Sequence, residues 1–418
     1  MLPPYSGPVT GEIEVAAAFA SLRRIADLQA LNAITREAAV VSARPPAAPG
    51  RHRAAAVSGI AVVVPARDEG AALGCSLESL ARQTLRPDRI VVVVNNSSDD
   101  TEDVAREFAA RPGVPQTDVL VMPGRNMFRK AGALNHGIRH LAGGGGCGGP
   151  LPPRIRYLLT MDGDTDLDSR FLERARNVMD GGPRLGGVSA ACLGKRVPAA
   201  SPWSRLLLLM QEIEYGRFTA TRLRRDVHTM SGAGSLYRAA ALNGLIERRR
   251  DVFEERATNL VEDYETTLAL KQAGWRVTAN QHCTAYTDLM PTMAMLVAQR
   301  VRWVRGTVDE WRRYGWCRAT RLSIAGMIAA LAATGYAGAW LAVSAAGIAR
   351  HGLQPDPRYL LLAAFWSAYQ GWSVKHMGWK IVLFEAALLP EMAFNVIRNY
   401  WLARAIAASY LGRAGAWS

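Results

Sequence analysis

The sequence predicts an α/β fold with a mostly parallel sheet, followed by C-terminal membrane helices. Two observations lead to this prediction. From residue 57 to residue 318, short apolar runs alternate with helical stretches, as in sheets with helical crossovers. Beyond residue 318 the chain becomes much more apolar. We therefore divide the 418 residues into an N-terminal helix and linker (1–56), an α/β domain (57–318) and a membrane region with two or three helices (319–418).

The N-terminal segment combines an Ala-rich amphipathic stretch, residues 11–41, with a Pro- and Gly-rich linker that reaches Gly50. It is either a packing arm or a helix that binds a membrane surface. Its first residues lack the pattern of a secretory signal, so we expect the α/β domain to stay in the cytoplasm. The five cysteines are widely spaced without a Cys-x-x-Cys pair, which fits a reducing compartment.

Strands are predicted in the α/β domain at 60–65, 89–94, 119–122 and 157–161, with helices at 71–83, 101–110 and 131–141. Ligands of open parallel sheets bind beyond the carboxyl ends of the strands. The polar residues that directly follow these strands are therefore candidate site residues. They are Asp68 and Glu69, then residues 95–101, 123–130 and 162–166.

Three carboxylates follow the fourth strand at alternate positions, Asp162, Asp164 and Asp166. In an extended segment this spacing directs them to one side, where they can share a cation such as Mg²⁺ or Mn²⁺. Such an ion would neutralise the diphosphate of a nucleotide donor. A solvated acidic loop is the alternative interpretation of the same three residues.

The net charge of +14 suits an anionic partner, such as nucleic acid, a phosphorylated substrate or an acidic membrane. The arginines are scattered and are not interleaved with aromatic residues as in nucleic-acid grooves. We therefore expect no nucleic-acid partner. The alternative, a basic RNA- or DNA-binding protein, predicts salt-dependent binding to an oligonucleotide.

Three apolar stretches make up the C-terminal region. Residues 322–349 carry no charge and exceed the roughly 20 residues that cross a bilayer. Residues 359–374 form a second, shorter stretch that completes a hairpin. The third, residues 381–403, contains Glu385, Glu391 and Arg398, so it is a functional span, an interfacial helix or a packed helix.

Several segments of the α/β domain form an ordered series. They are Val63–Glu69, Asn95–Thr101, Lys130–Asn135, Asp162–Asp164, Ser231–Ser235, Glu262–Asp263 and Gln299–Trp303. From about Ile60 to Trp316 the chain resembles the family-2 glycosyltransferases, in the branch of cellulose, chitin, hyaluronan and poly-N-acetylglucosamine synthases. The resemblance implies a GT-A-like nucleotide-sugar-binding domain. Two places depart from the family pattern, because the loop at Asn95 and Asn96 has Asn where Asp is commoner, and Val261 stands where Thr is frequent.

On the donor side, the resemblance implies contacts to a nucleotide sugar, expected to be a UDP-sugar. The residues assigned to it are Pro65, Arg67, Glu69, Asn95, Asn96, Asp99, Lys130, Asp162 and Arg302. Lys130 and Arg302 would bind phosphates. Asp162 would contact the ribose, and Asp164, with Asp162, would bind the metal.

On the acceptor side, the residues assigned are Gly232, Gly234, Ser235, Glu262, Gln299 and Trp303. Helical spacing places Gln299 and Trp303 on one face, where the indole can stack on a sugar. Asp263 is our candidate general base, since displacement at the anomeric carbon needs a carboxylate to accept the hydroxyl proton. The glycines also fit a tight turn, and the acidic pair also fits an ordinary helix start.

The sequence thus predicts a multi-pass membrane protein with a cytoplasmic catalytic domain. We expect a metal-dependent, inverting glycosyltransferase that acts on a glycan, glycolipid or protein-bound acceptor beside a lipid bilayer. A processive polysaccharide synthase of the same family is the alternative. A non-catalytic nucleotide-sugar-binding membrane scaffold is the alternative from another class.

Overall fold

The computed structural model describes residues 58–143, 149–195, 201–222, 226–352 and 357–411. The predicted N-terminal helix at 11–41 lies outside these residues. The division into segments 1–56, 57–318 and 319–418 stays a prediction.

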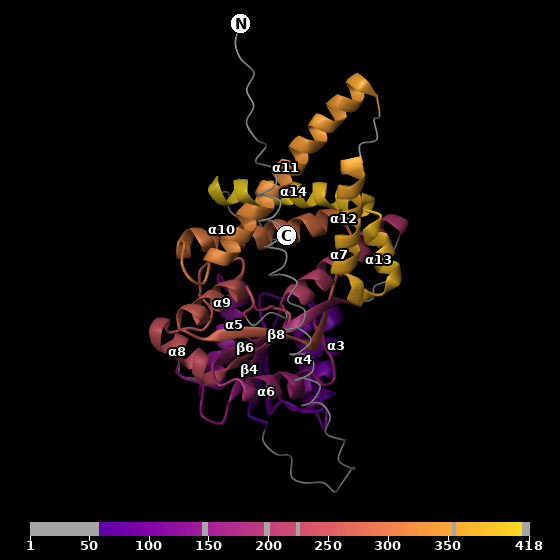
Figure 1. Cartoon of the computed structure of the whole chain (residues 1–418). Helices are drawn as coiled ribbons and strands as arrows, with labels where there is room; N and C mark the ends of the chain where they lie inside the picture. The colour runs from indigo at the N-terminus through magenta and orange to yellow at the C-terminus, as the bar shows by residue number, and fades with distance from the viewer. Residues whose placement is uncertain (1–57, 144–148, 196–200, 223–225, 353–356, 412–418) are drawn as a thin grey trace. The chain divides into compact units, whose positions relative to one another are not determined.

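Within the described residues, eight strands form one sheet in the order β3-β2-β1-β4-β7-β6-β8-β5 (Figure 1). The strands are β1 Ile60–Ala66, β2 Arg89–Val94, β3 Gln116–Val121, β4 Tyr157–Thr160, β5 Asp166–Leu167, β6 Leu185–Gly194, β7 Ser235–Arg238 and β8 Arg276–Thr287. The helices of this part are α3 Gly70–Ala81, α4 Thr101–Ala110, α5 Arg129–Leu141, α6 Phe171–Gly181, α7 Pro202–Arg222, α8 Ala239–Arg249 and α9 Glu262–Gln272.

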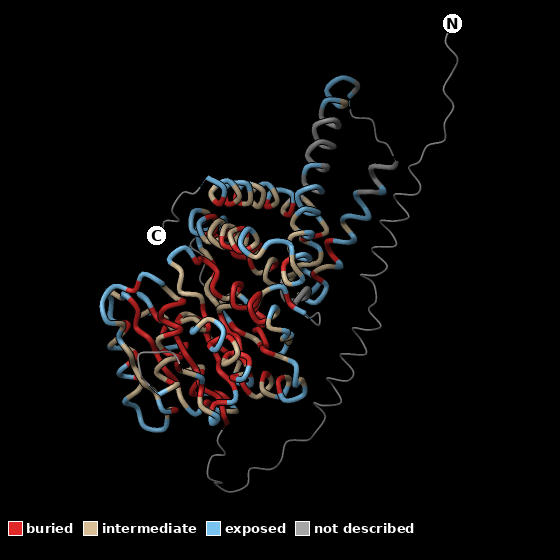
Figure 2. Tube along the Cα trace, turned by 90° about the vertical axis from the view of Figure 1, so that its left-hand side faces the viewer, coloured by how far each residue is buried: buried red, intermediate tan, exposed pale blue. Residues whose placement is uncertain are grey.

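The central strands are buried on both faces, which explains their continuous Val and Ile runs. Alternate residues of β1 enter different cores, because successive side chains of a strand point to opposite faces. Val62 and Val64 pack with the buried residues of α3, α4 and α6, whereas Val63 packs with those of α5 and α8. The domain therefore has helices on both sides of its sheet, and its buried residues follow the strands (Figure 2).

The sheet of the described residues is mixed: four of its strand pairs are parallel, including β6 with β8, and three are antiparallel. β1 pairs in parallel with β2 and β4, and β2 with β3, as the alternating pattern indicates. In contrast, β7 runs antiparallel to β4 and β6, and β5 runs antiparallel to β8. Helices and turns join the strands after residue 161. Apolar periodicity alone therefore does not show in which direction these strands run.

The C-terminal helices are α10 Met293–Tyr314, α11 Arg321–His351, α12 Pro357–Ser373, the 3₁₀ helix η1 Lys375–Met377, α13 Trp379–Ala386 and α14 Leu389–Tyr410. Among the described residues, none of the helices is both long and apolar enough to cross a membrane. The predicted spans 322–349 and 359–374 fall in α11 and α12, and the prediction of C-terminal membrane helices is therefore not supported. α12 is 17 residues long, short of the roughly 20 that a span requires.

The third predicted stretch, residues 381–403, is broken at Leu388, whose φ is 64°. Its two acids turn toward Arg217 of α7: the guanidinium contacts Glu385 and lies 3.0 Å from the Glu391 carboxylate. α14 also packs on α10. Of the three interpretations that the sequence left open, the structure therefore favours packed helices, since the charges that argued against a simple span form buried ion pairs.

Candidate active site

The loops that follow β1 and β2 are joined by hydrogen bonds. Asp68, in the left-handed region at φ 53°, accepts a hydrogen bond from the Ser98 N–H at 2.8 Å. The Asp99 carboxylate accepts the Gly70 N–H at 2.9 Å, and the hydrogen bond from the Thr101 hydroxyl lowers the pKa of Asp99. Asp99, assigned to the donor by resemblance, therefore also fixes the start of α3.

Asparagine amides join the loops that follow β2 and β3. The Asn95 amide accepts from Asn126 Nδ2 at 2.9 Å and donates to the Arg129 carbonyl at 3.3 Å. Asn96 donates to the Asn126 carbonyl at 3.1 Å and accepts the Asn126 N–H at 3.0 Å. A carboxylate at either position could only accept. Asn at positions 95 and 96 thus has a structural reason, because each side chain both donates and accepts here.

A cavity of about 500 Å³ opens beside these loops. It is lined by Arg67, Asn96, Arg125, Asn126, Met127, Arg129 and Ala257. Its three guanidinium groups make it suitable for a phosphate-bearing ligand. Burial and the nearby charges of Arg302 and Arg67 lower the pKa of Arg129, so Arg302 of α10 contributes to the same positive field.

Next to this positive region lies a cluster of carboxylates around Lys130, at the start of α5. The Lys130 amine contacts Asp162, which follows β4, and lies 3.0 Å from Glu262 at the start of α9. Burial alone would lower the pKa of Lys130, but Asp162, Glu262 and Asp263 raise it well above its usual range. Lys130 is therefore a fixed positive charge at the point where three elements meet.

Asp263 is held by two backbone donors. Its Oδ2 accepts the Gly232 N–H at 2.9 Å and its Oδ1 accepts the Tyr264 N–H at 2.7 Å. Burial and the adjacent Glu262 raise the pKa of Asp263 to about 6. Asp263 is thus an oriented carboxylate that is ionised at neutral pH and retains some affinity for a proton, as a general base requires.

A side chain at Gly232 would meet the end of Lys130. A methyl group there would lie 2.8 Å from the Lys130 amine and 3.4 Å from Asp263 Oδ2. Gly234 and Ser235 lie elsewhere: Gly234 faces Leu167 and Ala190, and the buried Ser235 hydroxyl donates to the Ser231 carbonyl at 2.7 Å. Of the three acceptor-side residues predicted here, Gly232 alone is brought against Lys130 and Asp263.

A second acidic group surrounds Asp164. Burial, Asp162 and Asp288 raise the pKa of Asp164 to about 6. Burial, followed by Asp164 and Asp162, raises the pKa of Glu69 to about 8. The Glu69 side chain lies close to Gly163, where a methyl group would come within 3.2 Å of its Cγ. These groups therefore concentrate negative charge at the carboxyl ends of β1 and β4.

Asp162 and Asp164 are the candidate metal ligands. Within the described part of the chain, no three His, Cys, Asp or Glu side chains converge as a metal site. Mg²⁺ is commonly bound by one or two carboxylates together with substrate phosphates, so a complete protein cage is not required. Besides burial, the neighbouring acids Asp162 and Asp288 raise the pKa of Asp164, and a cation would offset this mutual repulsion of carboxylates. Asp162 and Asp164 thus fit a metal that shares its ligands with a bound donor.

The Gln299–Trp303 segment of α10 is organised around its second residue. Arg300 is buried and pairs with Glu214 of α7 at 2.6 Å. It also donates to Gln299 Oε1 at 2.6 Å, and its guanidinium lies 4.4 Å from the centroid of the Trp303 ring. Gln299 and Trp303 are thus both in contact with Arg300. Their predicted contact with an acceptor stays a prediction.

Sequence reasoning did not single out several residues near the site. Arg129, Arg125 and Asn126 lie in the third polar segment, but their convergence depends on the left-handed backbone of Arg129, with φ 55°. Asp288 directly follows β8, a strand that was not predicted. The rule that points to strand ends would have found Asp288 had β8 been recognised.

Asn135, at the end of the Lys130–Asn135 segment, holds the loop between α8 and α9. Its amide donates to the Phe253 carbonyl at 2.6 Å and accepts the Phe253 N–H at 3.0 Å. Arg139, one turn later, donates to Asp251 at 2.5 Å and to Glu255 at 2.6 Å. This loop carries Ala257 of the cavity, so the helix that presents Lys130 also fixes one cavity wall.

The order of these site residues along the chain agrees with a match to the model of a protein family. Residues 58–306, which are more than half of the chain, match the model of glycosyltransferase-like family 2. The chain belongs to this family. The motifs that the sequence analysis used to infer it lie within the matched region, and the inference is confirmed.

Two curated relatives are similar to this glycosyltransferase. A poly-β-1,6-N-acetyl-D-glucosamine synthase from Staphylococcus epidermidis is 23% identical over 265 residues, which cover 62% of this chain and 57% of that protein. An N-acetylglucosaminyltransferase from Rhizobium sp. (strain N33) is 24% identical, over 60% of this chain and 52% of that protein. The glycosyltransferase therefore spans little more than half the length of these relatives.

Among solved structures, a mannosyltransferase from Pyrobaculum calidifontis in complex with GDP-Man and Mn²⁺ superposes with a TM-score of 0.54. The match covers 85% of this chain and 88% of that one, at 17% sequence identity. This likeness supports the GT-A-like α/β fold with a mixed sheet.

Proposed function

We propose that this glycosyltransferase moves a hexose or N-acetylhexosamine from a UDP-sugar to a hydroxyl group of a glycan, glycolipid or protein-bound acceptor. The observation that carries the proposal is the placement of Asp263. Its carboxylate is oriented by two backbone N–H groups and lies near the charge of Lys130, which follows directly on Arg129 of the cavity lined by three arginines. An oriented base next to an anion-binding cavity is the arrangement that transfer from a nucleotide sugar requires.

The proposed reaction is a single displacement. The acceptor hydroxyl gives its proton to Asp263 while its oxygen forms a bond to the anomeric carbon. The bond from that carbon to the diphosphate oxygen breaks on the opposite side, and UDP leaves with the electron pair. The anomeric configuration is inverted. Lys130 and Arg302 would stabilise the charge that develops on the leaving diphosphate.

We propose that Asp162 and Asp164 hold Mg²⁺ or Mn²⁺. When bound, the cation would supply positive charge to the diphosphate oxygens. The support from this chain is the grouping of Asp162, Asp164 and Asp288, where burial and the neighbouring acids raise the pKa of Asp164. The similar mannosyltransferase was solved with Mn²⁺, which is consistent with this proposal.

A processive polysaccharide synthase is the second candidate. It is favoured by the similarity to the poly-β-1,6-N-acetyl-D-glucosamine synthase, although this chain spans 57% of that protein. The two candidates share the donor chemistry and differ in the product. Product sizing separates them, because a synthase makes a long polymer and a single-addition enzyme extends its acceptor by one sugar.

We also propose that the protein is a multi-pass membrane protein, with its catalytic domain on the cytoplasmic side. The support is the uncharged sequence of residues 322–349 and the arginines that precede it, Arg318 and Arg321.

A donor screen tests the proposed function. UDP release from UDP-N-acetylglucosamine and UDP-glucose, with GDP-mannose as a comparison, is measured with and without Mn²⁺. We expect UDP release from a UDP-sugar, and we expect this release to depend on Mn²⁺. In Asp164→Ala the Mn²⁺-dependent release should be lost. Asp168→Ala is the matched control, since Asp168 pairs with Arg174 at 2.8 Å, outside the cluster around Asp164. Failure of every nucleotide sugar to react would contradict the proposal.

A further inference from the structure

Glu214 of α7 forms a largely buried ion pair with Arg300 of α10. The guanidinium donates from Nη2 and Nε to Glu214 Oε2, at 2.6 Å and 3.1 Å. From Nη1 it donates to Gln299 Oε1 at 2.6 Å. Arg300 is 4% exposed, and the side chain of Glu214 is 13% exposed. Because the N–H groups of a guanidinium lie in its plane, Glu214 and Gln299 together set the orientation of that plane.

The orientation of this plane determines where the indole of Trp303 lies. The central carbon of the Arg300 guanidinium is 4.4 Å from the centroid of the Trp303 ring, a distance at which a cation is attracted to the face of the ring. Arg300 and Trp303 are three residues apart, so both project from the same side of α10. The guanidinium also lies 5.7 Å from the centroid of the Tyr215 ring. Arg300 is thus fixed on several sides, whereas Trp303 is only partly buried.

An ion pair is not needed to join α7 to α10. Apolar residues of both helices share one buried cluster, among them Leu207, Met210 and Ile213 of α7 and Leu296 and Val297 of α10. A buried ion pair often contributes less to stability than apolar residues of similar volume, because both charges lose their hydration. Helix packing alone therefore does not explain why Glu214 and Arg300 are charged.

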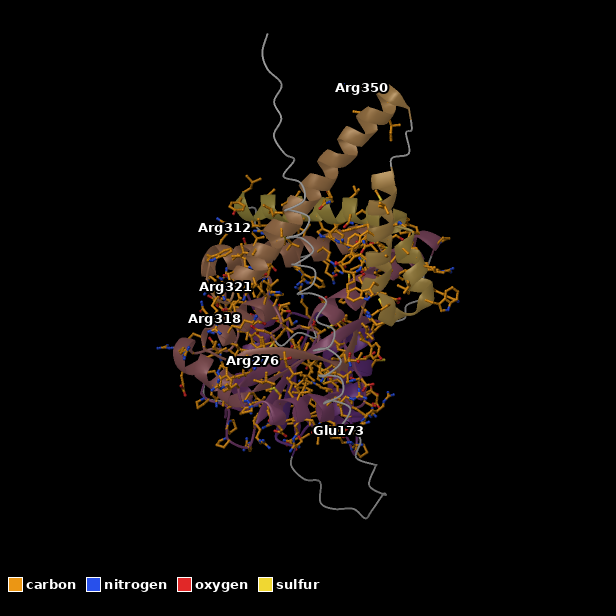
Figure 3. The ribbon with its side chains drawn as sticks, in the orientation of Figure 1. Glu173, Arg276, Arg312, Arg318, Arg321 and Arg350 are labelled. Carbon is orange, nitrogen blue, oxygen red and sulfur yellow. The ribbon has the colours of Figure 1, made fainter. Side chains whose placement is uncertain are left out.

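The backbone of α10 is also fixed beyond the ion pair. Arg312, labelled in Figure 3, lies about three turns beyond Arg300 on the same helix. Its guanidinium donates to the Ser409 carbonyl of α14 at 2.7 Å. Loss of the Glu214 charge should therefore disturb the guanidinium of Arg300 and the ring that lies against it, rather than the course of the helix.

Trp303 lies one turn from the point where α10 meets the segment of the candidate base. A methyl group at Gly306 would lie 2.7 Å from Val261 Cγ1, so the two segments are in close contact. Val261 is followed in the chain by Glu262 and Asp263. Gly306 is three residues beyond Trp303, so the two share one face of the helix. The indole is therefore on the face of α10 that is turned toward Asp263, where an acceptor hydroxyl would react.

We propose that Glu214 is a positioning residue for the acceptor sugar, which acts by fixing Arg300 and, through it, the ring of Trp303. The guanidinium covers one face of the indole, and a pyranose ring would stack its C–H groups on the other face. The proposal rests on the proposed function, since it assumes transfer to a sugar hydroxyl. It adds that the acceptor surface depends on a charge of α7 that itself contacts neither substrate.

The first experiment observes the ring of Trp303 directly. The full chain is purified in detergent with 5-fluorotryptophan in place of its 11 tryptophans, and Trp303→Phe assigns the fluorine NMR signal of Trp303. Glu214→Gln should shift this signal, because the charge beside the ring moves. Glu212→Gln, at a partly exposed site on another face of α7, is the matched control and should leave the signal in place. An unshifted Trp303 signal in Glu214→Gln would overturn the proposal.

The second experiment separates acceptor binding from donor binding. Transfer from UDP-N-acetylglucosamine and UDP-glucose is measured on two tetrasaccharides, acetylated chitotetraose and cellotetraose. In Glu214→Gln the KM for the tetrasaccharide should rise roughly tenfold, while the KM for the donor should stay within about twofold of wild type. Trp303→Ala should also raise the acceptor KM. Adding Glu214→Gln to it should cause no further rise, because both changes remove the same contact, and additive effects would contradict the proposal.

Arg300→Lys distinguishes positioning from a purely structural ion pair, and it still provides the test if Glu214→Gln unfolds. Lysine keeps a positive charge beside Glu214 but lacks the planar guanidinium. A structural pair predicts a normal acceptor KM in this variant, whereas our proposal predicts a raised one. Absence of UDP release by the wild type with every donor would count against the proposed function. UDP release with a normal acceptor KM in both variants would count against the role of Glu214 alone.

Discussion

Replacing Asp263 by Asn removes the proposed base with little change in shape. General base catalysis contributes about 10²- to 10⁴-fold to a rate, so we expect the transfer rate to fall by that factor. The variant should bind the UDP-sugar almost as well as wild type, since the arginines of the cavity and Asp162 are unchanged. Rates and donor affinity are measured separately, by UDP release under saturating donor and by equilibrium titration.

The structure also predicts the pH dependence of this variant. Burial and Glu262 raise the pKa of Asp263 from 3.8 to about 6, and the ionised form is the active base. Wild-type transfer should therefore rise with pH through about 6 and level off above it. In Asp263→Asn the remaining rate should lack this step. Glu107→Gln, a surface change on α4, is the control and should keep it.

Stability should change in the opposite direction from activity. A raised pKa means that the folded state favours neutral Asp263, so this stabilisation is complete below about pH 3.8 and is lost as the pH rises through about 6. The rise corresponds to an upper limit of about 3 kcal/mol at pH 7. Asn is always neutral but leaves either the Gly232 or the Tyr264 N–H without an acceptor, which costs about 1–3 kcal/mol.

The net expectation is a variant that is inactive and, at pH 7, about as stable as wild type or slightly more stable. Its stability relative to wild type should improve between pH 4 and pH 7, as measured by thermal unfolding. Retained turnover in Asp263→Asn, or a pH step near 6 that survives the substitution, would refute the assignment of the base.

Three further substitutions test the rest of the site. Gly232→Ala should displace the flexible end of Lys130 without straining the backbone, so we expect at least a tenfold fall in transfer with a melting temperature close to that of wild type; normal transfer would contradict the geometry. Asn95→Asp loses the donor to the Arg129 carbonyl and should lower the free energy of unfolding by about 1–3 kcal/mol, measured by denaturant titration. Asp164→Ala should abolish the dependence of UDP release on Mn²⁺, and an unchanged metal titration would exclude Asp164 as a ligand.

The parallel half of the sheet could be predicted from the sequence. Strands that are buried on both faces require continuous apolar runs, and β1, β2 and β4 lie where those runs do. The polar loops after them were located for the same reason. β7 and β8 were missed because their direction and pairing depend on contacts with strands far away in the sequence. Such contacts produce no periodic pattern in the local sequence.

The site itself was predicted unevenly. Lys130, Asp162 and Asp263 came from ordered motifs, and the structure brings them together. The role of Asn95 could not be read from the sequence, because it depends on hydrogen bonds to Asn126 and to a carbonyl of α5. Gln299 and Trp303 share a helical face as expected, but their common partner is the buried Arg300, whose ion pair with α7 is a tertiary contact.

In the C-terminal region, too, tertiary contacts answered a question that the sequence pattern left open. Hydropathy alone identified three apolar stretches but could not assign the charges in the third, because an acid in such a stretch is compatible with a span, an interface or a packed helix. The contacts of Glu385 and Glu391 with Arg217 decided in favour of packing.

By itself, the sequence determined the family and the α/β class and supplied the candidate site residues, because these depend on residue types and on order along the chain. The tertiary structure decided which of them meet, how burial shifts the pKa of Asp263, and which cation the buried acids of the C-terminal helices contact. Those properties depend on distances between residues far apart in sequence, and the local pattern of side chains does not contain them.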